Sequence, residues 1–384
     1  MKKYFIFFIV ILCGVRVLRA QTELDDSIFS GGIYRDYRLY IPDTYIAGEE
    51  VPLLLNLHGY SSNNLSQEFY GEFRPIADTA NFIIVLPNGT YDPDFPIFRY
   101  WNCFTAAGSG GVDDVQFLSD LIDTLMNEYS IDANRIYSTG MSNGGFMSYA
   151  LACELSERIA AVASVTGSIS KARIGSCDPQ HPTPVMEIHG TLDGTVPYNG
   201  SDIFLPIDSV VKYWVNVNNC NPEPEVIEVP DINMGDGCTA THFIYSGGDN
   251  NARVEHYRIN NGGHTWPGTL ITIGTTNKDM SASKEIWNFF SQYKLDILSD
   301  IKPIKEAEFS LKIFPNPFEE KFFIQQNAVY PVSNISIFDM NGRKIFYTEH
   351  NTPTKINTAG WTSGIYFVVA EVNGEIACGK VVKQ

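Results

Sequence analysis

One short segment, Gly140-Met141-Ser142-Asn143-Gly144, constrains the fold of this chain more than any other. The run Arg135 to Thr139 before it suits a short strand, and residues 144–151 after it read as a helix. Glycines on both sides of Ser142 let a strand turn sharply into a helix, because a Cβ at either position would clash with neighbouring backbone. The segment therefore predicts a strand, a tight turn and a helix at the carboxyl end of a parallel sheet.

Strand-like and helix-like stretches alternate along most of the chain, which is the pattern of an α/β fold. Continuous apolar runs suited to buried strands lie at Val51 to Leu57, Phe82 to Leu86 and Ile159 to Val165. An amphipathic helix capped by the preceding aspartate is predicted over Asp114 to Tyr129, and a closing helix over Ser281 to Tyr293. We expect an α/β domain with a mostly parallel central sheet.

The sequence changes character after Leu295. Residues 300–308 form a short polar stretch, and short alternating strands with turns at Asn341-Gly342 and Asn373-Gly374 follow from Phe309 onward. This pattern predicts a small, separate all-β sandwich. The expected organisation is a signal peptide over 1–20, an α/β domain over 21–298, a linker over 299–308 and the sandwich over 309–384.

The amino terminus has the pattern of a secretion signal: Lys2-Lys3, an apolar stretch from Tyr4 to Val15, and Ala20 before Gln21. Since the stretch is too short to span a bilayer, the mature chain is expected to have no membrane span and to be secreted or held at the cell surface. A net charge of -17 without basic runs excludes the electrostatic footprint of a nucleic-acid binder.

Six cysteines follow the signal peptide: Cys103, Cys153, Cys177, Cys220, Cys238 and Cys378. An even number permits disulfides in an oxidising compartment, although sequence alone allows many pairings. Cys153 lies far down the helix that leaves Ser142 and Cys177 precedes the run 184–188, so we expect these two to pair. Cys220 and Cys238 flank a proline-rich segment and are expected to close a local loop, with the other two unpaired. None has the spacing of zinc ligands.

Two further segments carry side chains that would act with Ser142. Asp193 follows the strand-like run Pro184 to Ile188, and His264 lies in a glycine-rich loop after the run Val254 to Ile259. A serine hydroxyl is a weak nucleophile until a base takes its proton. Histidine, with an unperturbed pKa of about 6.5, can take that proton near neutrality when a carboxylate holds it in the right tautomer. We predict a catalytic triad of Ser142, Asp193 and His264.

Rival side chains for these roles lie in less suitable positions. The rival carboxylates are Asp202, Asp208, Asp231 and Asp236, and the rival histidines are His58, His181, His189, His242, His256 and His350. The carboxylates fall in less defined loops or at a helix start, and the histidines lie within strands, in a proline-rich loop or in the carboxyl-terminal sandwich. We expect His58 and His189 to brace their loops.

The run 53–57 ends in His58-Gly59-Tyr60, where such a fold supplies an oxyanion donor. The donor would be the backbone N–H of Tyr60. A second donor would be the backbone N–H of Asn143, because that residue starts the helix after Ser142 and lies at the positive end of its dipole. We predict an oxyanion hole formed by these two groups.

These motifs, together with Trp101-Asn102, 189–191, 196–198 and 265–268, resemble those of the secreted feruloyl esterase and polyhydroxybutyrate depolymerase family of the α/β-hydrolase superfamily. The family includes carbohydrate esterases that act on xylan side groups. The resemblance spans Tyr34 to Tyr293. It implies an α/β-hydrolase fold, the triad named above, and neither a metal nor an organic cofactor. The chain departs from the family at Ser246-Gly247, where members often carry a cysteine.

The carboxyl-terminal region has a resemblance of its own. Its segments 314–318, 337–343 and 364–367 are similar to those of the sorting domain that the type IX secretion system reads, which implies that machinery as a partner. A carbohydrate-binding module is the competing interpretation. Its aromatic side chains would be Trp361, Tyr366 and Phe367, but these lack the spacing of a planar platform.

The substrate is the least constrained part of the prediction. An aromatic acid such as ferulate needs aromatic walls, which Trp101 and Trp266 are expected to supply, with Tyr60 beside them. The same residues would also suit a polyester groove. The first interpretation is an esterase acting on plant cell-wall polysaccharide, the second a polyhydroxyalkanoate depolymerase and the third a peptidase. An inactive hydrolase that serves as a surface binding module is the alternative from another class.

Overall fold

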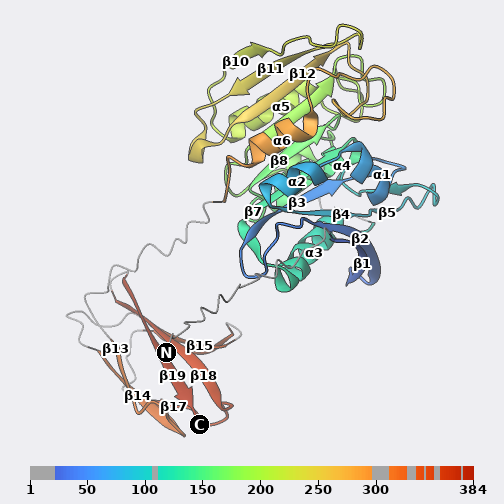
Figure 1. Ribbon diagram of the computed structural model, residues 1–384. Coiled ribbons are helices and arrows are strands. Elements are labelled where there is room, and N and C mark those ends of the chain that lie inside the picture. Colours follow the sequence, from blue (N-terminus) through green and yellow to red (C-terminus); the bar gives the residue numbers. More distant parts are fainter. Residues whose placement is uncertain are drawn as a thin grey trace, which may run out of the picture. The chain divides into compact units, whose positions relative to one another are not determined.

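A computed structural model describes residues 22–105, 111–295, 311–326, 334–340, 343–349, 355–372 and 375–384. The chain divides into two compact units, Met1–Asp296 and Ile297–Gln384 (Figure 1). The expected signal peptide and linker lie outside the described residues. None of the described helices has the length and apolar character needed to cross a membrane.

The described part of the first unit is built on a ten-stranded sheet. Its strands, in spatial order, are β1 (Thr22–Ser30), β2 (Ile33–Ile41), β4 (Ile83–Pro87), β3 (Val51–Leu57), β7 (Ile131–Met141), β8 (Ala161–Val165), β9 (Val185–Gly190), β12 (Val254–Asn260), β11 (Thr239–Tyr245) and β10 (Glu225–Glu228). The strands from β4 to β12 run parallel. Antiparallel pairs extend both edges. The mostly parallel sheet is thus confirmed.

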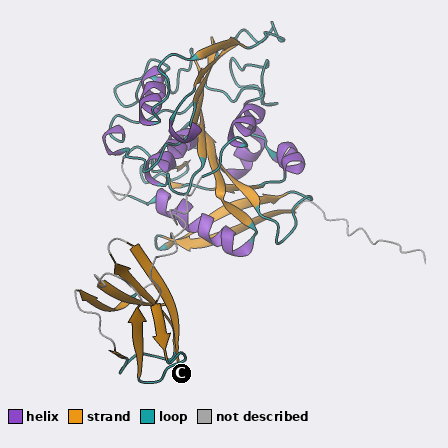
Figure 2. Cartoon of the chain, turned by 90° about the vertical axis from the view of Figure 1, so that its left-hand side faces the viewer, coloured by secondary structure: helices purple, strands orange, loops and turns teal. Residues whose placement is uncertain are grey.

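Helices cover both faces of this sheet (Figure 2). They are α1 (Asn64–Tyr70), α2 (Arg74–Ala80), α3 (Asp114–Glu128), α4 (Asn143–Glu154), α5 (Ile207–Val217) and α6 (Ala282–Phe290), with 3-10 turns at Ile174–Ser176 and Asp249–Asn251. Side chains of α3 and α5 belong to one apolar cluster, and those of α2 and α6 to another. Since both faces are covered, every residue of β3, β4 and β8 is buried.

The predicted elements are present, with shifted ends. The Asp113 side chain accepts the Gln116 N–H at 2.9 Å, so it caps α3 as expected. Strand β7 begins at Ile131, before the predicted start, because that residue pairs with Val51 of β3. A short hairpin, β5 (Thr90–Tyr91) and β6 (Arg99–Tyr100), is an addition that the sequence did not predict.

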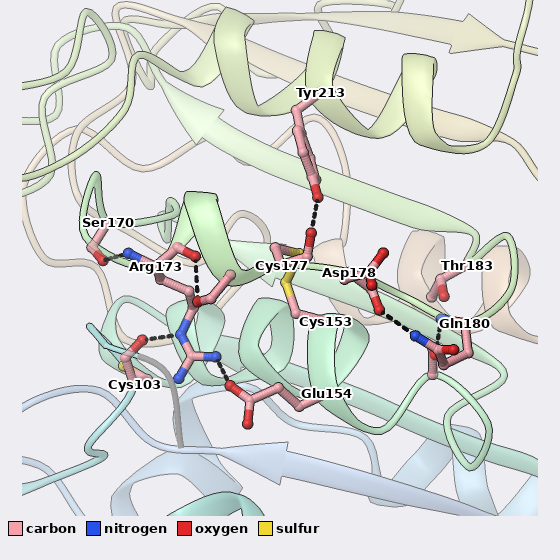
Figure 3. The surroundings of a disulfide bond; sticks show 12 residues. Cys103, Cys153, Glu154, Ser170, Arg173, Cys177, Asp178, Gln180, Thr183 and Tyr213 are labelled. Atoms are coloured by element: carbon pink, nitrogen blue, oxygen red, sulfur yellow. Dashed lines mark hydrogen bonds and ion pairs between the residues drawn. A yellow bond between two sulfur atoms is a disulfide. The ribbon is translucent and has the colours of Figure 1, made fainter. Parts of the chain in front are cut away.

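The predicted disulfide between Cys153, near the end of α4, and Cys177 is present (Figure 3). Cys103 and Cys378 are free, as predicted. Figure 3 also shows Arg173, which lies in the same loop as Cys177 and whose Nε–H donates to the Cys103 carbonyl at 2.7 Å. The disulfide and this side chain therefore tie the segment after β6 to the end of α4.

The predicted disulfide between Cys220 and Cys238 is wrong, since both thiols are buried and free. Cys220 lies near the end of β11, where the Asn221 N–H donates to the Ser246 carbonyl at 2.8 Å. Cys238 immediately precedes the other end of the same strand. A seven-residue strand separates its two ends by about 20 Å, which is far beyond the reach of a disulfide. A short distance along the chain was therefore a poor guide to proximity.

The described part of the second unit contains two small sheets. One has the order β13 (Leu311–Phe314), β14 (Lys321–Gln326), β17 (Lys355–Asn357), and the other β16 (Lys344–Glu349), β15 (Asn334–Asp339), β18 (Gly364–Val372), β19 (Glu375–Lys383). Both contribute to one apolar core, so the predicted all-β sandwich is confirmed. Tyr366 is buried in this core and the Trp361 ring packs against it at 4.9 Å. These two rings therefore do not form an exposed sugar-binding platform.

Candidate active site

Ser142 lies at the turn between β7 and α4, in the predicted strand–turn–helix unit. Its φ of 55° is in the left-handed region, and its backbone N–H donates to the Val165 carbonyl at 2.8 Å. A Cβ on Gly140 would lie 2.6 Å from the Leu57 carbonyl oxygen, and one on Gly144 would lie 2.2 Å from it. Both glycines are therefore required, because β3 passes directly against the turn.

Asp193 lies just beyond β9, with its side chain fully buried. Its Oδ1 accepts the backbone N–H groups of Thr195 and Val196, each at 2.8 Å, and its Oδ2 accepts the His264 Nδ1–H at 2.7 Å. Burial alone would raise the pKa of this carboxyl. The hydrogen bonds and charges of its neighbours, His264 first, outweigh burial and lower the pKa of Asp193. The side chain is held as a carboxylate that faces His264.

His264 lies in the loop after β12, which the sequence placed beside the acid. The Thr191 N–H donates to the Ile259 carbonyl and the Leu192 N–H to the Gly262 carbonyl, both at 2.9 Å, so the loops after β9 and β12 are locked together. Because Nδ1 of His264 donates to Asp193, its Nε2 carries the free lone pair. The imidazole side chain is 20% exposed. The imidazole is therefore partly open to solvent.

The loop after β3 runs beside Ser142. A Cβ on Gly59 would lie 3.4 Å from the Met141 carbonyl oxygen and 3.5 Å from the Ser142 Cβ. The next N–H, that of Tyr60, has no recorded acceptor among the residues that the structure describes. Asn143 is the first residue of α4, where backbone N–H groups have no intrahelical acceptor. Asn143 therefore follows Ser142 directly in the chain, and Gly59, the neighbour of Tyr60, lies against Ser142.

His58 braces the loop after β3, as the sequence predicted. Its Nδ1–H donates to the Gly59 carbonyl at 2.7 Å, and its Nε2 accepts the Gly89 N–H at 3.0 Å. One ring nitrogen donates and the other accepts, which is the pattern of a neutral imidazole. Burial lowers the pKa of His58 to about 4. The side chain is thus neutral and structural.

The side chain of Asn143 has a role that the motif did not reveal. Its Oδ1 accepts the Trp101 N–H at 2.6 Å, and its Nδ2 donates to the Trp101 carbonyl at 3.1 Å. The guanidinium of Arg173 holds the same segment by donating to the carbonyls of Cys103 (Figure 3) and Thr105. The segment after β6 is therefore fixed against the start of α4. Nothing in the sequence distinguishes Arg173 from a surface arginine.

The prediction that Trp101 and Trp266 contact substrate is not supported. The two side chains are 0% and 1% exposed. The Trp101 indole N–H donates to the His58 carbonyl at 2.9 Å, and that of Trp266 to Ser283 Oγ at 3.1 Å. Trp266 borders a cavity of about 190 Å³, but at 1% exposure it presents almost no surface to that cavity. Both indoles pack in the core, because each finds an internal acceptor.

Other apolar side chains near the predicted triad are exposed. Tyr60 is 41% exposed, and its ring lies 5.7 Å from that of Phe98. Leu192, directly before Asp193, is 66% exposed. The sequence analysis identified Tyr60 and missed Leu192, because a single leucine in a loop carries no distinctive signal. These two exposed residues follow β3 and β9, which lie on opposite sides of β7 in the sheet.

The fold of the first unit is that of an α/β-hydrolase. It is similar to the solved structure of the acetyl xylan esterase from Aspergillus awamori, with a TM-score of 0.53 and 12% identity over 70% of this chain and 99% of that one. Residues 35–178 match the family described as Esterase PHB depolymerase, and residues 312–384 match the Secretion system C-terminal sorting domain. These matches confirm both resemblances drawn from the motifs, and with them a secreted or cell-surface location.

Curated relatives agree with this assignment. The chain is 26% identical over 265 residues to a bifunctional acetylxylan esterase/xylanase of Neocallimastix patriciarum, which is 69% of this chain and 34% of the relative. It is 28% identical over 234 residues to feruloyl esterase B of Piromyces equi, which is 58% of this chain and 41% of the relative. The chain therefore spans well under two thirds of the length of these proteins.

Proposed function

We propose that the first unit is a serine esterase that hydrolyses carboxylic esters through an acyl-enzyme. The observation that carries the proposal is the hydrogen bond between His264 Nδ1 and Asp193 Oδ2 at 2.7 Å. Ser142 lies at the same end of the parallel sheet, at the turn between β7 and α4. Relatives that are named as feruloyl and acetylxylan esterases support the reaction class.

The chemistry follows from the roles that these groups can take. The Ser142 hydroxyl attacks the ester carbonyl while Nε2 of His264 takes its proton, and the charge that forms on the imidazole is balanced by Asp193. The backbone N–H groups of Tyr60 and Asn143 bind the oxyanion. His264 then protonates the leaving alcohol. Water, deprotonated by the same imidazole, attacks the acyl-serine and releases the acid.

The proposed substrates are feruloyl or acetyl esters on plant cell-wall polysaccharide. The exposed ring of Tyr60 and the exposed side chain of Leu192 offer apolar contact for an acyl group, whereas the carbohydrate would stay in solvent. Hydrolysis rates on methyl ferulate, acetylated xylan and polyhydroxybutyrate test this choice. We expect the plant esters to be cleaved faster, and faster hydrolysis of the polyester would reject it.

A polyhydroxyalkanoate depolymerase is the second candidate, favoured by the description of the family that residues 35–178 match. An inactive surface binding module is the alternative from another class. A spectrophotometric assay with p-nitrophenyl acetate separates this module from the two esterases. A chain that folds and does not cleave this activated ester would be no esterase.

The second unit is proposed to direct export through the type IX secretion machinery. If this is its only role, a chain ending at Asp300 should cleave both soluble and insoluble esters as fast as the full chain, because the proposed triad lies within the first unit. The same truncation should stay in the periplasm of a host that has this machinery. Normal export with activity lost only on insoluble polymer would identify a binding module instead.

A further inference from the structure

A second histidine stands behind the proposed catalytic acid. His189, the penultimate residue of β9, is fully buried. Its Nδ1 lies 2.8 Å from Glu187 Oε1 and its Nε2 lies 2.8 Å from the Val196 carbonyl oxygen. The same Nε2 is 3.4 Å from Asp193 Oδ2. All the oxygens that face the ring are thus of types that ordinarily accept hydrogen bonds.

The partners of His189 decide where its protons lie. A carbonyl oxygen can only accept, so Nε2 must carry a hydrogen. One further proton lies between Nδ1 and Glu187. The other carboxylate oxygen, Oε2, accepts the Tyr149 hydroxyl at 2.7 Å. This hydrogen bond favours an ionised Glu187, and therefore a second proton on His189.

The proton affinities point the same way. Burial by itself lowers the pKa of His189, but the hydrogen bond and charge of Glu187, together with the charge of Asp193, outweigh it and raise that pKa. Burial also raises the pKa of Glu187, which opposes an ionised pair. The Asp193 carboxylate favours the ionised pair, because it stabilises a cation 3.4 Å away and adds nothing to a neutral pair.

We propose that His189 is a buried imidazolium, paired with Glu187, that keeps Asp193 ionised and oriented for its contact with His264. The inference rests on the proposed function, since it assigns a task within that site. It makes His189 a positioning residue, because the ring acts on Asp193 and does not reach a substrate.

The backbone of Val196 links His189 to Asp193. Its carbonyl accepts from His189, and its N–H donates to Asp193 Oδ1 at 2.8 Å. The turn that presents Asp193 is therefore held at its far end by the buried ring. The other carboxylate oxygen, Oδ2, lies 2.7 Å from His264 Nδ1 and 3.4 Å from His189 Nε2. A carboxylate with both oxygens occupied in this way has one orientation.

The charge of His189 also affects His264. A cation on the far side of Asp193 opposes the formation of a second cation on His264. Loss of the His189 charge should move the acid limb of the kcat/KM profile to higher pH.

Other titratable groups near His189 do not cancel this effect. On the adjacent strand, burial lowers the pKa of His256 to about 4, so that ring is neutral near pH 7. The Tyr198 ring lies 6.0 Å from His189, and its hydroxyl donates to Asp208. From α4, Tyr149 is neutral because burial raises its pKa well above the ordinary value. Among the described residues, the charged groups that act on the pKa of His189 are Glu187 and Asp193.

The first test measures the charge directly. A long-range ¹H–¹⁵N correlation spectrum of the full chain at pH 7 should show both ring nitrogens of His189 protonated, with the signals assigned by their loss in His189→Gln. One protonated and one bare nitrogen would overturn the proposal. This measurement is independent of activity, so it separates a failure of the inference from a failure of the proposed esterase function.

The second test measures the consequence with p-nitrophenyl acetate. His189→Gln keeps a donor for Val196 but loses the charge; we expect kcat to fall roughly tenfold or more with little change in KM. The acid limb of kcat/KM should move up by about half a pH unit or more. Glu187→Gln should move it in the same direction, because His189 without its anion becomes neutral.

His256→Gln is the matched control. It removes a buried but uncharged histidine from the neighbouring strand, and should leave the acid limb in place. If both the His189 and Glu187 variants lose activity without any shift of the limb, His189 is only a brace and the proposal fails. If His189→Gln does not fold, the Glu187→Gln profile and the spectrum of the unaltered chain decide the question.

Discussion

Two His-Gly dipeptides lie at strand ends on either side of Ser142, and their imidazole rings differ in charge, since His58 is neutral and His189 is the proposed cation. His58-Gly59 follows β3 on the oxyanion side, and His189-Gly190 ends β9 on the acid side. Both rings are fully buried. His58 donates from one nitrogen and accepts at the other, whereas the nitrogens of His189 face a carboxylate and a carbonyl.

The difference shows that the partners of a buried histidine, and not its burial, set its charge. Burial opposes the cation at both positions. At His58 burial outweighs the hydrogen bond to Gly59 and the charge of Asp36, and the pKa falls to about 4. At His189 two carboxylates compensate, and the pKa is raised. On the oxyanion side, the neutral His58 braces a loop beside the negative charge that develops on the substrate. On the acid side, the His189 cation lies beside the permanent negative charge of Asp193.

Removing the group that both sides serve should have the largest effect. Ser142→Ala is expected to lower kcat by about a millionfold, because the loss of a triad nucleophile costs that much in subtilisin. The fold should be unchanged, as circular dichroism would show. Ser156→Ala is the matched control, since its hydroxyl accepts the Gln180 N–H and lies past the other end of α4. Retention of more than a few per cent of activity would reject Ser142 as the nucleophile.

A change confined to the acid side should have the next largest effect on kcat. Asp193→Asn keeps the shape of the side chain, but an amide holds His264 in the wrong tautomer, so kcat should fall by about 10⁴-fold. The measurement is kcat on p-nitrophenyl acetate with thermal unfolding as the check on folding. A loss of tenfold or less would place the catalytic carboxylate elsewhere.

A change confined to the oxyanion side should cost less. Tyr60→Pro removes the backbone N–H, and the loss of one oxyanion donor lowers kcat by about 10²- to 10³-fold. Tyr60→Phe is the control, because it keeps that N–H and loses only the hydroxyl that donates to Asp92 at 2.9 Å. Equal activity of the two variants, both folded, would show that the donor lies elsewhere.

The sequence predicted the parts of this site that depend on local backbone chemistry. Gly140 and Gly144 are needed wherever a strand turns tightly into a helix, and the parallel strands bring Asp193 and His264 to one edge of the sheet. The order of elements was therefore enough to place them. The prediction that His58 braces its loop by hydrogen bonds agrees with its contacts to Gly59 and Gly89.

The sequence could not predict features that depend on contacts between distant segments. The burial of Trp101 and Trp266 depends on acceptors at His58 and Ser283. The charge of His189 depends on Tyr149, a residue of another element. A signal was nonetheless present in β9, since Glu187 lies within an apolar run and a buried carboxylate requires a partner.

The smallest predicted effect tests the comparison through stability. The pKa of His58 is about 4 in the folded chain and about 6.5 when unfolded. Between these values the unfolded chain binds a proton that the folded chain does not. The contribution of a neutral His58 to the free energy of unfolding is therefore complete above about pH 6.5 and decreases as the pH falls toward 4, by up to about 3 kcal/mol.

His58→Gln removes this titration, so the free energy of unfolding of the unaltered chain should fall relative to that of the variant over the same window. Urea unfolding at a series of pH values measures it, and His256 cancels because it is present in both proteins. The His189 contribution has the opposite sign, since a raised pKa stabilises the folded chain at low pH and the effect is lost as the pH rises through the folded value. If the His58 and His189 differences follow the same slope with pH, the two histidines share one charge state and the distinction between the two sides of the site fails.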